Sequence, residues 1–122
     1  MSAPSADKVL RAKQKGWRRR YPRYRANFPL TANAFREDGY LVLQGRCSDI
    51  GQGGMGVVLT PPAQSSEVLS VEFTLSNHPT PLTLRAIVRY REGFTCGLEF
   101  LGVSSEQQSI IDTFCATLEV TD

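Results

Sequence analysis

Apolar residues occupy every second position between residues 82 and 90, opposed mainly by Thr and Arg, which is typical of a β-strand with one buried face. The apolar positions are Leu82, Leu84, Ala86, Val88 and Tyr90. Glu92-Gly93 predicts a tight turn, and the alternation resumes over residues 94–100. Because so short a connection cannot cross over to a parallel partner, we expect these two strands to be antiparallel neighbours.

Shorter segments of the same kind fill most of the chain after Pro29. Residues 40–47, 55–60 and 71–75 each predict a strand, and Phe28 and Leu30 begin an earlier one. Turn-forming residues separate these segments at 37–39, 49–54, 61–62 and 77–79. Many short strands with frequent turns predict a mainly-β sandwich or barrel.

The end of the chain has a different pattern, which predicts a helix over residues 105–119. Ser105 and Gln108 have the spacing of a capping box, in which two side chains bond the free backbone groups at a helix start. Apolar residues then recur at helical intervals and form one stripe. They are Ile110, Ile111, Phe114, Cys115 and Leu118. We expect this helix to close one end of the β core.

Charge is distributed unevenly along the 122 residues. The formal net charge is +2, yet residues 1–25 hold nine basic side chains and only Asp7, which gives +8. Residues 26–122 hold five basic and eleven acidic side chains, which gives −6. We expect residues 1–16 to be a flexible basic segment and residues 17–122 to form one domain. Such a basic segment indicates an anionic target: nucleic acid, a phosphate ligand, a membrane surface or the protein's own acidic face.

Several functional classes find no support in the sequence. No apolar run approaches the ~20 residues that span a membrane, and no secretory signal is evident, so we expect a cytoplasmic protein. His78 is the one histidine, and the three cysteines are widely spaced, which argues against a zinc site or a disulfide framework. We expect Cys47, Cys96 and Cys115 to be core residues. Since no nucleophile, base and orienting group occur together, we expect neither enzymatic activity nor a cofactor.

Arginines are concentrated in residues 18–25, Arg-Arg-Arg-Tyr-Pro-Arg-Tyr-Arg. Pro22 restricts its own backbone and favours an extended Tyr21, so a regular helix is not expected here. The planar guanidinium group bonds phosphates and guanine edges with two parallel donors, and its face can stack on a base. This segment therefore predicts a site for a phosphate-bearing ligand just before the first strand.

A second unusual segment is Asp49-Ile50-Gly51-Gln52-Gly53-Gly54. Its three glycines permit unusual backbone angles and close approach of a ligand. Asp49 can accept two hydrogen bonds from the N1–H and 2-amino groups of a guanine. The segment is not a phosphate-binding P-loop, because no Gly-Lys-Ser/Thr follows it.

Together, Arg-Arg-Tyr-Pro-Arg at 19–23 and Asp-Ile-Gly-Gln-Gly-Gly at 49–54 resemble the RxxxR and DxSxxG motifs of the PilZ domain family. Gly-Leu-Glu-Phe at 97–100 looks like the family's penultimate-strand ending. The resemblance covers residues 17–118. It implies a six-stranded antiparallel β-barrel with a C-terminal α-helix and a bacterial cyclic di-GMP receptor rather than an enzyme.

The resemblance also implies a set of ligand-binding residues. They are Arg18, Arg19, Arg20, Arg23, Asp49, Gly51, Gly53 and Gly54. The arginines would hold the phosphates and guanines of one cyclic di-GMP or of an intercalated pair. Asp49 would bond a guanine edge, and Gly54 would keep the loop tight enough for the ligand to lie flat.

One position departs from the family motif, because Gly51 stands where the family has serine. Loss of that hydroxyl hydrogen bond costs about 1–3 kcal/mol of binding free energy. The alternative hypothesis is therefore a PilZ-like adaptor that acts through protein contacts with weak or no nucleotide binding. A third hypothesis, nucleic-acid binding by the basic segment, does not explain Asp49 and its glycines. The downstream protein partner is not predicted.

Overall fold

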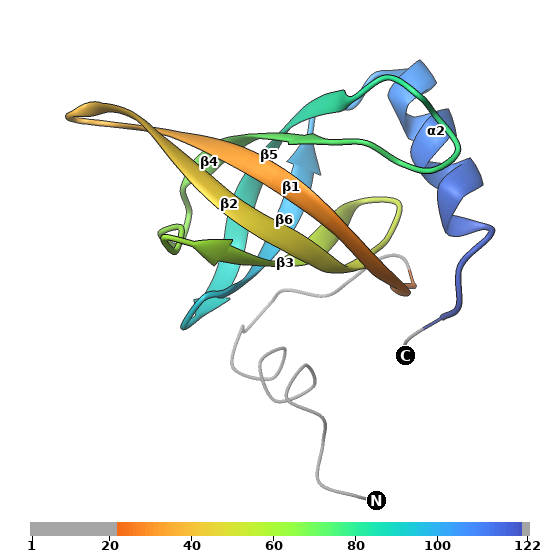
Figure 1. Cartoon of the computed structure of the whole chain (residues 1–122), viewed down its shortest axis with the longest axis horizontal. Coiled ribbons are helices and arrows are strands. Elements are labelled where there is room, and N and C mark those ends of the chain that lie inside the picture. Colours follow the sequence, from red (N-terminus) through yellow and green to blue (C-terminus); the bar gives the residue numbers. More distant parts are fainter. Residues whose placement is uncertain (1–21, 121–122) are drawn as a thin grey trace, which may run out of the picture.

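The computed structural model describes residues 22–120 (Figure 1). Its elements are β1 (Tyr24–Arg36), β2 (Gly39–Ile50), β3 (Gly54–Thr60), β4 (Val68–Phe73), β5 (Leu82–Glu92), β6 (Thr95–Leu101) and α2 (Ser105–Cys115). The expected strands are all present, and the predicted antiparallel pairing of β5 with β6 is confirmed. The predicted flexible segment at residues 1–16 lies outside the described residues.

The six strands form a closed barrel in the order β1-β2-β3-β6-β5-β4. Every neighbouring pair is antiparallel, and β1 closes the barrel by pairing with β4 from Thr31↔Glu72 to Ala34↔Leu69. Closure satisfies the backbone donors and acceptors that an open sheet would leave at its edges. The strand pattern allowed a barrel or a sandwich, and the structure is a barrel.

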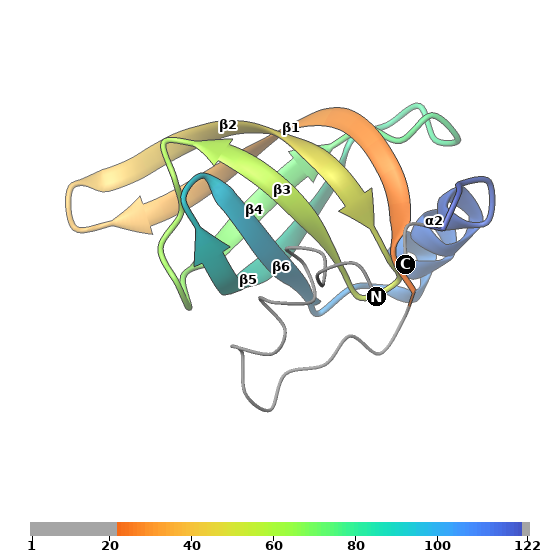
Figure 2. The same cartoon turned by 90° about the horizontal axis from the view of Figure 1, so that it is seen from below.

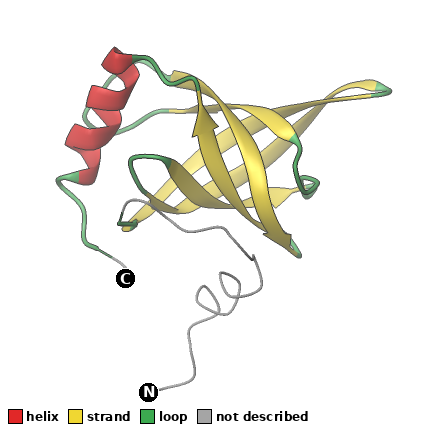
Figure 3. Cartoon of the chain, turned by 180° about the vertical axis from the view of Figure 1, so that it is seen from behind, coloured by secondary structure: helices red, strands yellow, loops and turns green. Residues whose placement is uncertain are grey.

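The core lies inside the barrel and extends to α2, which covers one end of it (Figure 3). The alternating residues of β5 from Leu82 to Tyr90 are all buried, as the spacing of two predicted. Phe28 connects barrel and helix, because its ring contacts Phe73 at 5.4 Å and Phe114 at 6.0 Å between centroids. Cys47, Cys96 and Cys115 are buried free thiols, as expected.

The helix begins at the predicted residue 105, but its capping residues and its end differ from the prediction. Its capping box is formed by Ser104 and Gln107, one residue earlier than the predicted Ser105–Gln108 pair. It ends at Cys115 rather than at residue 119. Beyond Cys115 the backbone bonds shorten to three-residue spacing, since the N–H of Leu118 donates to the Cys115 carbonyl at 3.0 Å. This tighter turn directs the chain back toward the start of β1.

The chain after α2 pairs with the beginning of β1. The N–H of Arg25 donates to the Glu119 carbonyl at 2.8 Å, and Tyr24 forms an isolated antiparallel bridge with Val120. Both segments therefore lie side by side at the α2 end of the barrel (Figure 2). Within residues 22–120, no helix has the length and apolar character to span a membrane.

Candidate ligand-binding site

The two sequence motifs meet at one ion pair between Arg23 and Asp49. Arg23 Nη1 donates to Asp49 Oδ1 at 2.5 Å, across 26 residues of sequence. The Arg23 side chain is 7% exposed and that of Asp49 is 29% exposed. Pairing of β1 with β2 produces this contact, because Arg25 lies opposite Asp49 and Tyr24 lies opposite Ile50. The register of one hairpin thus brings an arginine of the first motif to the aspartate of the second.

Asp49 belongs to the end of β2, not to the loop that the sequence predicted over 49–54. Strand β2 continues to Ile50 and β3 begins at Gly54, so the loop contains residues 51–53 alone. The register of β2 against β3 shifts between Cys47 and Asp49, as a β-bulge does. Such bulges redirect a side chain and are common beside functional sites. Here the bulge precedes the carboxylate of the motif.

Gly56 provides the space that the Asp49 carboxylate occupies. Gly56 lies opposite Asp49 on β3, and a Cβ atom at this position would lie 2.7 Å from Asp49 Oδ2. Any larger residue would therefore displace the carboxylate. Gly56 was not predicted as a site residue, although its position two residues after Gly54 was a signal, since residues two apart on a strand point to the same face.

Gly51 packs against Pro22 and Arg23, the first two described residues. A Cβ atom at Gly51 would lie 2.7 Å from the Pro22 carbonyl oxygen and 3.1 Å from Arg23 Cδ. The Gly51 N–H donates to the Gly54 carbonyl at 2.8 Å, which holds the loop in a tight turn. Because Gly51 has no side chain, Pro22 and Arg23 pack onto the loop at the position where the family motif has serine.

Gly53 and Gly54 connect the loop to β6. The Gly53 carbonyl accepts a hydrogen bond from the Phe100 N–H at 2.9 Å. A Cβ atom at Gly54 would lie 2.1 Å from the Leu98 carbonyl oxygen, closer than any side chain can approach a backbone. Gly54 therefore permits the close contact of β3 with β6 that closes the barrel on this side.

Helix α2 is also bonded to the loop, through a glutamine that the sequence analysis did not identify as a site residue. Gln108 Nε2 donates to the Gln52 carbonyl at 2.9 Å and to Asp112 Oδ1 at 2.8 Å. The Gln52 loop is therefore fixed between α2 and β6. The sequence pattern assigned Gln108 to a capping box, whereas the folded chain shows that it contacts the Gln52 loop.

Burial and charge keep the nearby thiols in their neutral form. Cys47 Sγ donates to the Asp49 carbonyl at 3.1 Å, and burial together with the charge of Asp49 raises its pKa. Burial raises the pKa of Cys115 to about 11, and Asp112 adds to this effect while the charge of Arg23 opposes it. A neutral thiol is a poor nucleophile and a poor metal ligand, so these groups are structural.

The raised thiol pKa values predict a loss of stability at alkaline pH. The unfolded chain ionises Cys115 near its ordinary pKa of 9.0, whereas the folded chain retains the proton up to about pH 11. The stabilising contribution of the protonated Cys115 thiol is therefore fully present below pH 9 and is lost as the pH rises from 9.0 to about 11. At about pH 10, this effect of Cys115 should lower the free energy of unfolding by about 1 kcal/mol. Urea unfolding measures this change. A Cys115→Ala variant should show a smaller loss between pH 7 and 10, and an equal loss would contradict this explanation.

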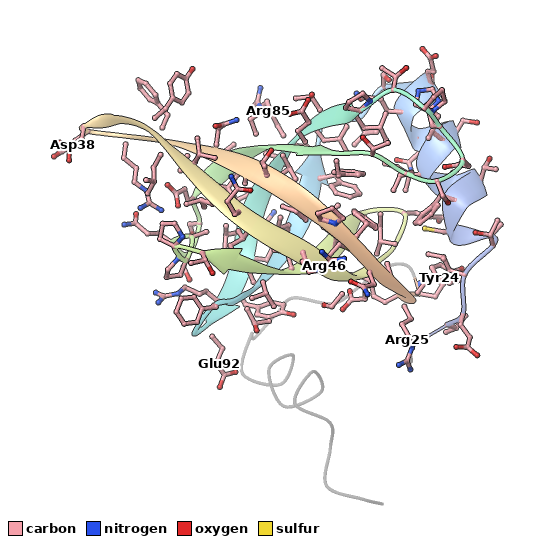
Figure 4. The ribbon with its side chains drawn as sticks, in the orientation of Figure 1. Tyr24, Arg25, Asp38, Arg46, Arg85 and Glu92 are labelled. Atoms are coloured by element: carbon pink, nitrogen blue, oxygen red, sulfur yellow. The ribbon has the colours of Figure 1, made fainter. Side chains whose placement is uncertain are left out.

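The remaining arginines discussed above are exposed or lie outside the described residues. Arg18, Arg19 and Arg20 lie outside the described residues. Arg25 is exposed at the start of β1 and points outward (Figure 4). Arg85, Arg89 and Arg91 form the exposed face of β5 that the alternation indicated. Arg89 Nε pairs there with Glu99 Oε1 at 2.5 Å. Within residues 22–120, no group of three or more potential metal ligands is present.

Three comparisons place this geometry among known proteins. The family model for the PilZ domain matches residues 18–117. No curated protein matches the chain. Among solved structures, the PilZ domain of CeSA from a cellulose-synthesizing bacterium aligns with a TM-score of 0.62 at 18% identity, covering 78% of this chain and 95% of that one.

Two further structures have the same fold. The PilZ domain of YcgR from Escherichia coli, solved with c-di-GMP, gives a TM-score of 0.65 at 20% identity, covering 84% of this chain and 92% of that one. The Bacillus subtilis inhibitor of motility, MotI/DgrA, gives 0.63 at 22% identity, covering 83% of this chain but about half (51%) of that one. Since the family model spans most of the chain, the protein belongs to the PilZ domain family, a family of cyclic di-GMP receptor domains.

Proposed function

We propose that this protein is a bacterial, cytoplasmic cyclic di-GMP receptor that carries out no chemistry on its ligand. The contact between Arg23 and Asp49 is the observation that carries the proposal, because it brings residues of both motifs to one place. Arg18, Arg19, Arg20 and Arg23 would supply cations for the phosphates and guanines. Asp49, Gly51, Gly53 and Gly54 would supply the barrel side of the site.

The chemistry of the ligand suits these groups. Cyclic di-GMP has two phosphates, each an anion that a guanidinium group can bond with parallel N–H donors. Its guanine bases offer N1–H and 2-amino donors, which a carboxylate accepts. Because Asp49 Oδ1 accepts a hydrogen bond from Arg23, the ligand would either share this carboxylate with Arg23 or displace Arg23 from it.

Ligand binding would also change a surface that a downstream protein could recognise. The ligand's negative charge would offset the excess positive charge of residues 1–25 and hold this segment against the barrel. The loop at Gln52 is bonded to α2 through Gln108, so a shift of the loop would reach the helix. In this proposal, the ligand site and α2, the element that would respond to the ligand, lie at the same end of the barrel.

The proposal is tested by calorimetric titration of cyclic di-GMP into two single-arginine variants. Arg23→Ala should weaken binding by at least tenfold, because a lost charge-assisted hydrogen bond costs about 1.5–3 kcal/mol. Arg85→Ala, an exposed arginine on β5, should bind like the unmodified chain. Equal affinities of the two variants would reject the assigned site.

The second candidate is the adaptor with weak or no nucleotide binding, and the contact at Gly51 favours it. Pro22 and Arg23 already cover the loop where the family serine would reach a ligand. If the missing hydroxyl limits binding, Gly51→Ser should raise the affinity for cyclic di-GMP even though its Cβ must displace Pro22. If the unmodified chain binds tightly and Gly51→Ser binds less tightly, the adaptor hypothesis is excluded and Gly51 is a packing residue.

A further inference from the structure

The β1–β2 hairpin extends beyond the barrel on the side away from α2 (Figures 1 and 2). Pairing of β1 with β4 ends at Ala34, and pairing of β2 with β3 begins at Gln44. Between these points, and among residues 22–120, the two strands pair only with each other, up to Arg36↔Gly39. The end of the hairpin therefore has two strand edges that the closed barrel does not satisfy.

The β1 edge is covered by the loop that precedes β4. Arg36 donates from Nε and Nη2 to the two carboxylate oxygens of Glu67, at 2.8 and 2.9 Å. The Gln64 N–H donates to Glu67 Oε1 at 2.9 Å, which fixes the loop in turn. The hydrogen bonds of Arg36 lower the pKa of Glu67, so this cover is ionised at neutral pH.

The β2 edge from Gly39 to Leu43 has no such cover among the described residues. Its sequence, Gly-Tyr-Leu-Val-Leu, contains no charge and no proline, the devices that usually protect a free edge. Tyr40 is 77% exposed and Val42 is 49% exposed. Phe35, 74% exposed, contacts Tyr40 at 5.2 Å between ring centroids. An apolar strand edge thus lies beside an exposed aromatic pair.

We propose that this edge pairs with the same edge of a second copy of the chain to form a two-fold symmetric dimer. The free segment has five residues on each copy, because β3 occupies the edge from Gln44 onward. Antiparallel pairing centred on Leu41 uses all five and places Tyr40 opposite Val42 of the second copy. Directly opposite side chains share a face, so Phe35, Tyr40 and that valine would form one apolar cluster, repeated by the symmetry.

The charges near this edge favour a second copy over an unrelated strand. Glu37 and Asp38 form the acidic tip of the hairpin, and Arg46 lies further along β2 on the outer face (Figure 4). The antiparallel pairing brings the acidic tip of each copy toward Arg46 of the other. Opposite charges therefore meet twice, and they fix the direction in which the two strands pair.

The first test compares lysine substitutions at two similarly exposed valines, Val42 on the free edge and Val68 on β4, which is 45% exposed. In sedimentation velocity, the full chain should increase in mass with concentration, from 13.5 kDa toward twice that value. Val42→Lys should shift this equilibrium by at least about tenfold, because it places a charge without a partner in each apolar cluster. Val68→Lys should behave like the unmodified chain. A constant monomer mass, or equal effects of both variants, would overturn the proposal.

The second test checks the register by disulfide formation between two variants. Directly opposite residues of an antiparallel pair lie about 4.5–5.5 Å apart at Cα, within the range that a disulfide bridges. A mixture of Tyr40→Cys and Val42→Cys chains should form a mixed disulfide under mild oxidation. A mixture of Val42→Cys and Val68→Cys should not, and the three native cysteines are buried. Similar yields in both mixtures would reject this pairing.

Discussion

Replacement of Asp49 with alanine is expected to lower the free energy of unfolding by about 3 kcal/mol and to abolish measurable cyclic di-GMP binding. The folded state would retain the Arg23 guanidinium, 7% exposed, without the carboxylate that it contacts at 2.5 Å. Loss of one partner from a buried ion pair is costly because the remaining charge stays poorly hydrated. Urea unfolding and calorimetric titration of the same protein sample measure both effects.

A second ion pair provides the control for this prediction. Arg89 and Glu99 pair at the same distance of 2.5 Å, but their side chains are 41% and 44% exposed. Because exposed pairs contribute about 0–1 kcal/mol, Glu99→Ala should change stability little and leave ligand binding intact. Equal stability losses in Asp49→Ala and Glu99→Ala would contradict the structural role assigned to Asp49.

Replacement of Gly54 with alanine is expected to destabilise the barrel by about 3 kcal/mol or more. Its Cβ would lie 2.1 Å from the Leu98 carbonyl, and neither backbone can move without opening the contact of β3 with β6. The loss should appear in urea unfolding, with reduced cooperativity if β3 and β6 separate.

Gly102 distinguishes this steric effect from the conformational cost of replacing a glycine. Gly102 has a φ of +61° and open space around its missing side chain. Gly102→Ala should therefore cost about 1 kcal/mol, from backbone strain alone. If Gly54→Ala is as stable as the unmodified chain but loses cyclic di-GMP, the glycine serves the ligand, as the family resemblance implied, and not the barrel.

The strand pattern predicted the strands and their buried faces well, because burial follows the spacing of two along each strand, whereas the choice of a barrel came from the family resemblance. The alternation over Leu82–Tyr90 identified the buried face of β5 and its antiparallel neighbour. The helix start was predicted correctly, but the capping residue was misassigned by one position because Ser104 and Ser105 are equally good caps in sequence, and the helix ends four residues before the predicted residue 119. After α2 the chain turns so that Val120 can pair with Tyr24. This long-range contact cannot be predicted from a local sequence pattern.

The candidate site was predictable only in part. Arg23 and Asp49 were both identified, but their contact depends on the register of β1 with β2. Gly56 and Gln108 were missed because their importance comes from what they face, a carboxylate and a loop carbonyl. Gly51 was interpreted as the loss of a hydroxyl group, whereas the structure shows that the glycine also admits the Pro22 carbonyl.

The most direct test of the proposed receptor function is calorimetric titration of the full unmodified chain with cyclic di-GMP. We expect saturable binding with a ligand-to-protein ratio of one or two, the latter for an intercalated pair, and a dissociation constant in the micromolar range or tighter. A folded protein that releases no binding heat at high-micromolar ligand would contradict the proposal that Arg23 and Asp49 belong to a cyclic di-GMP site.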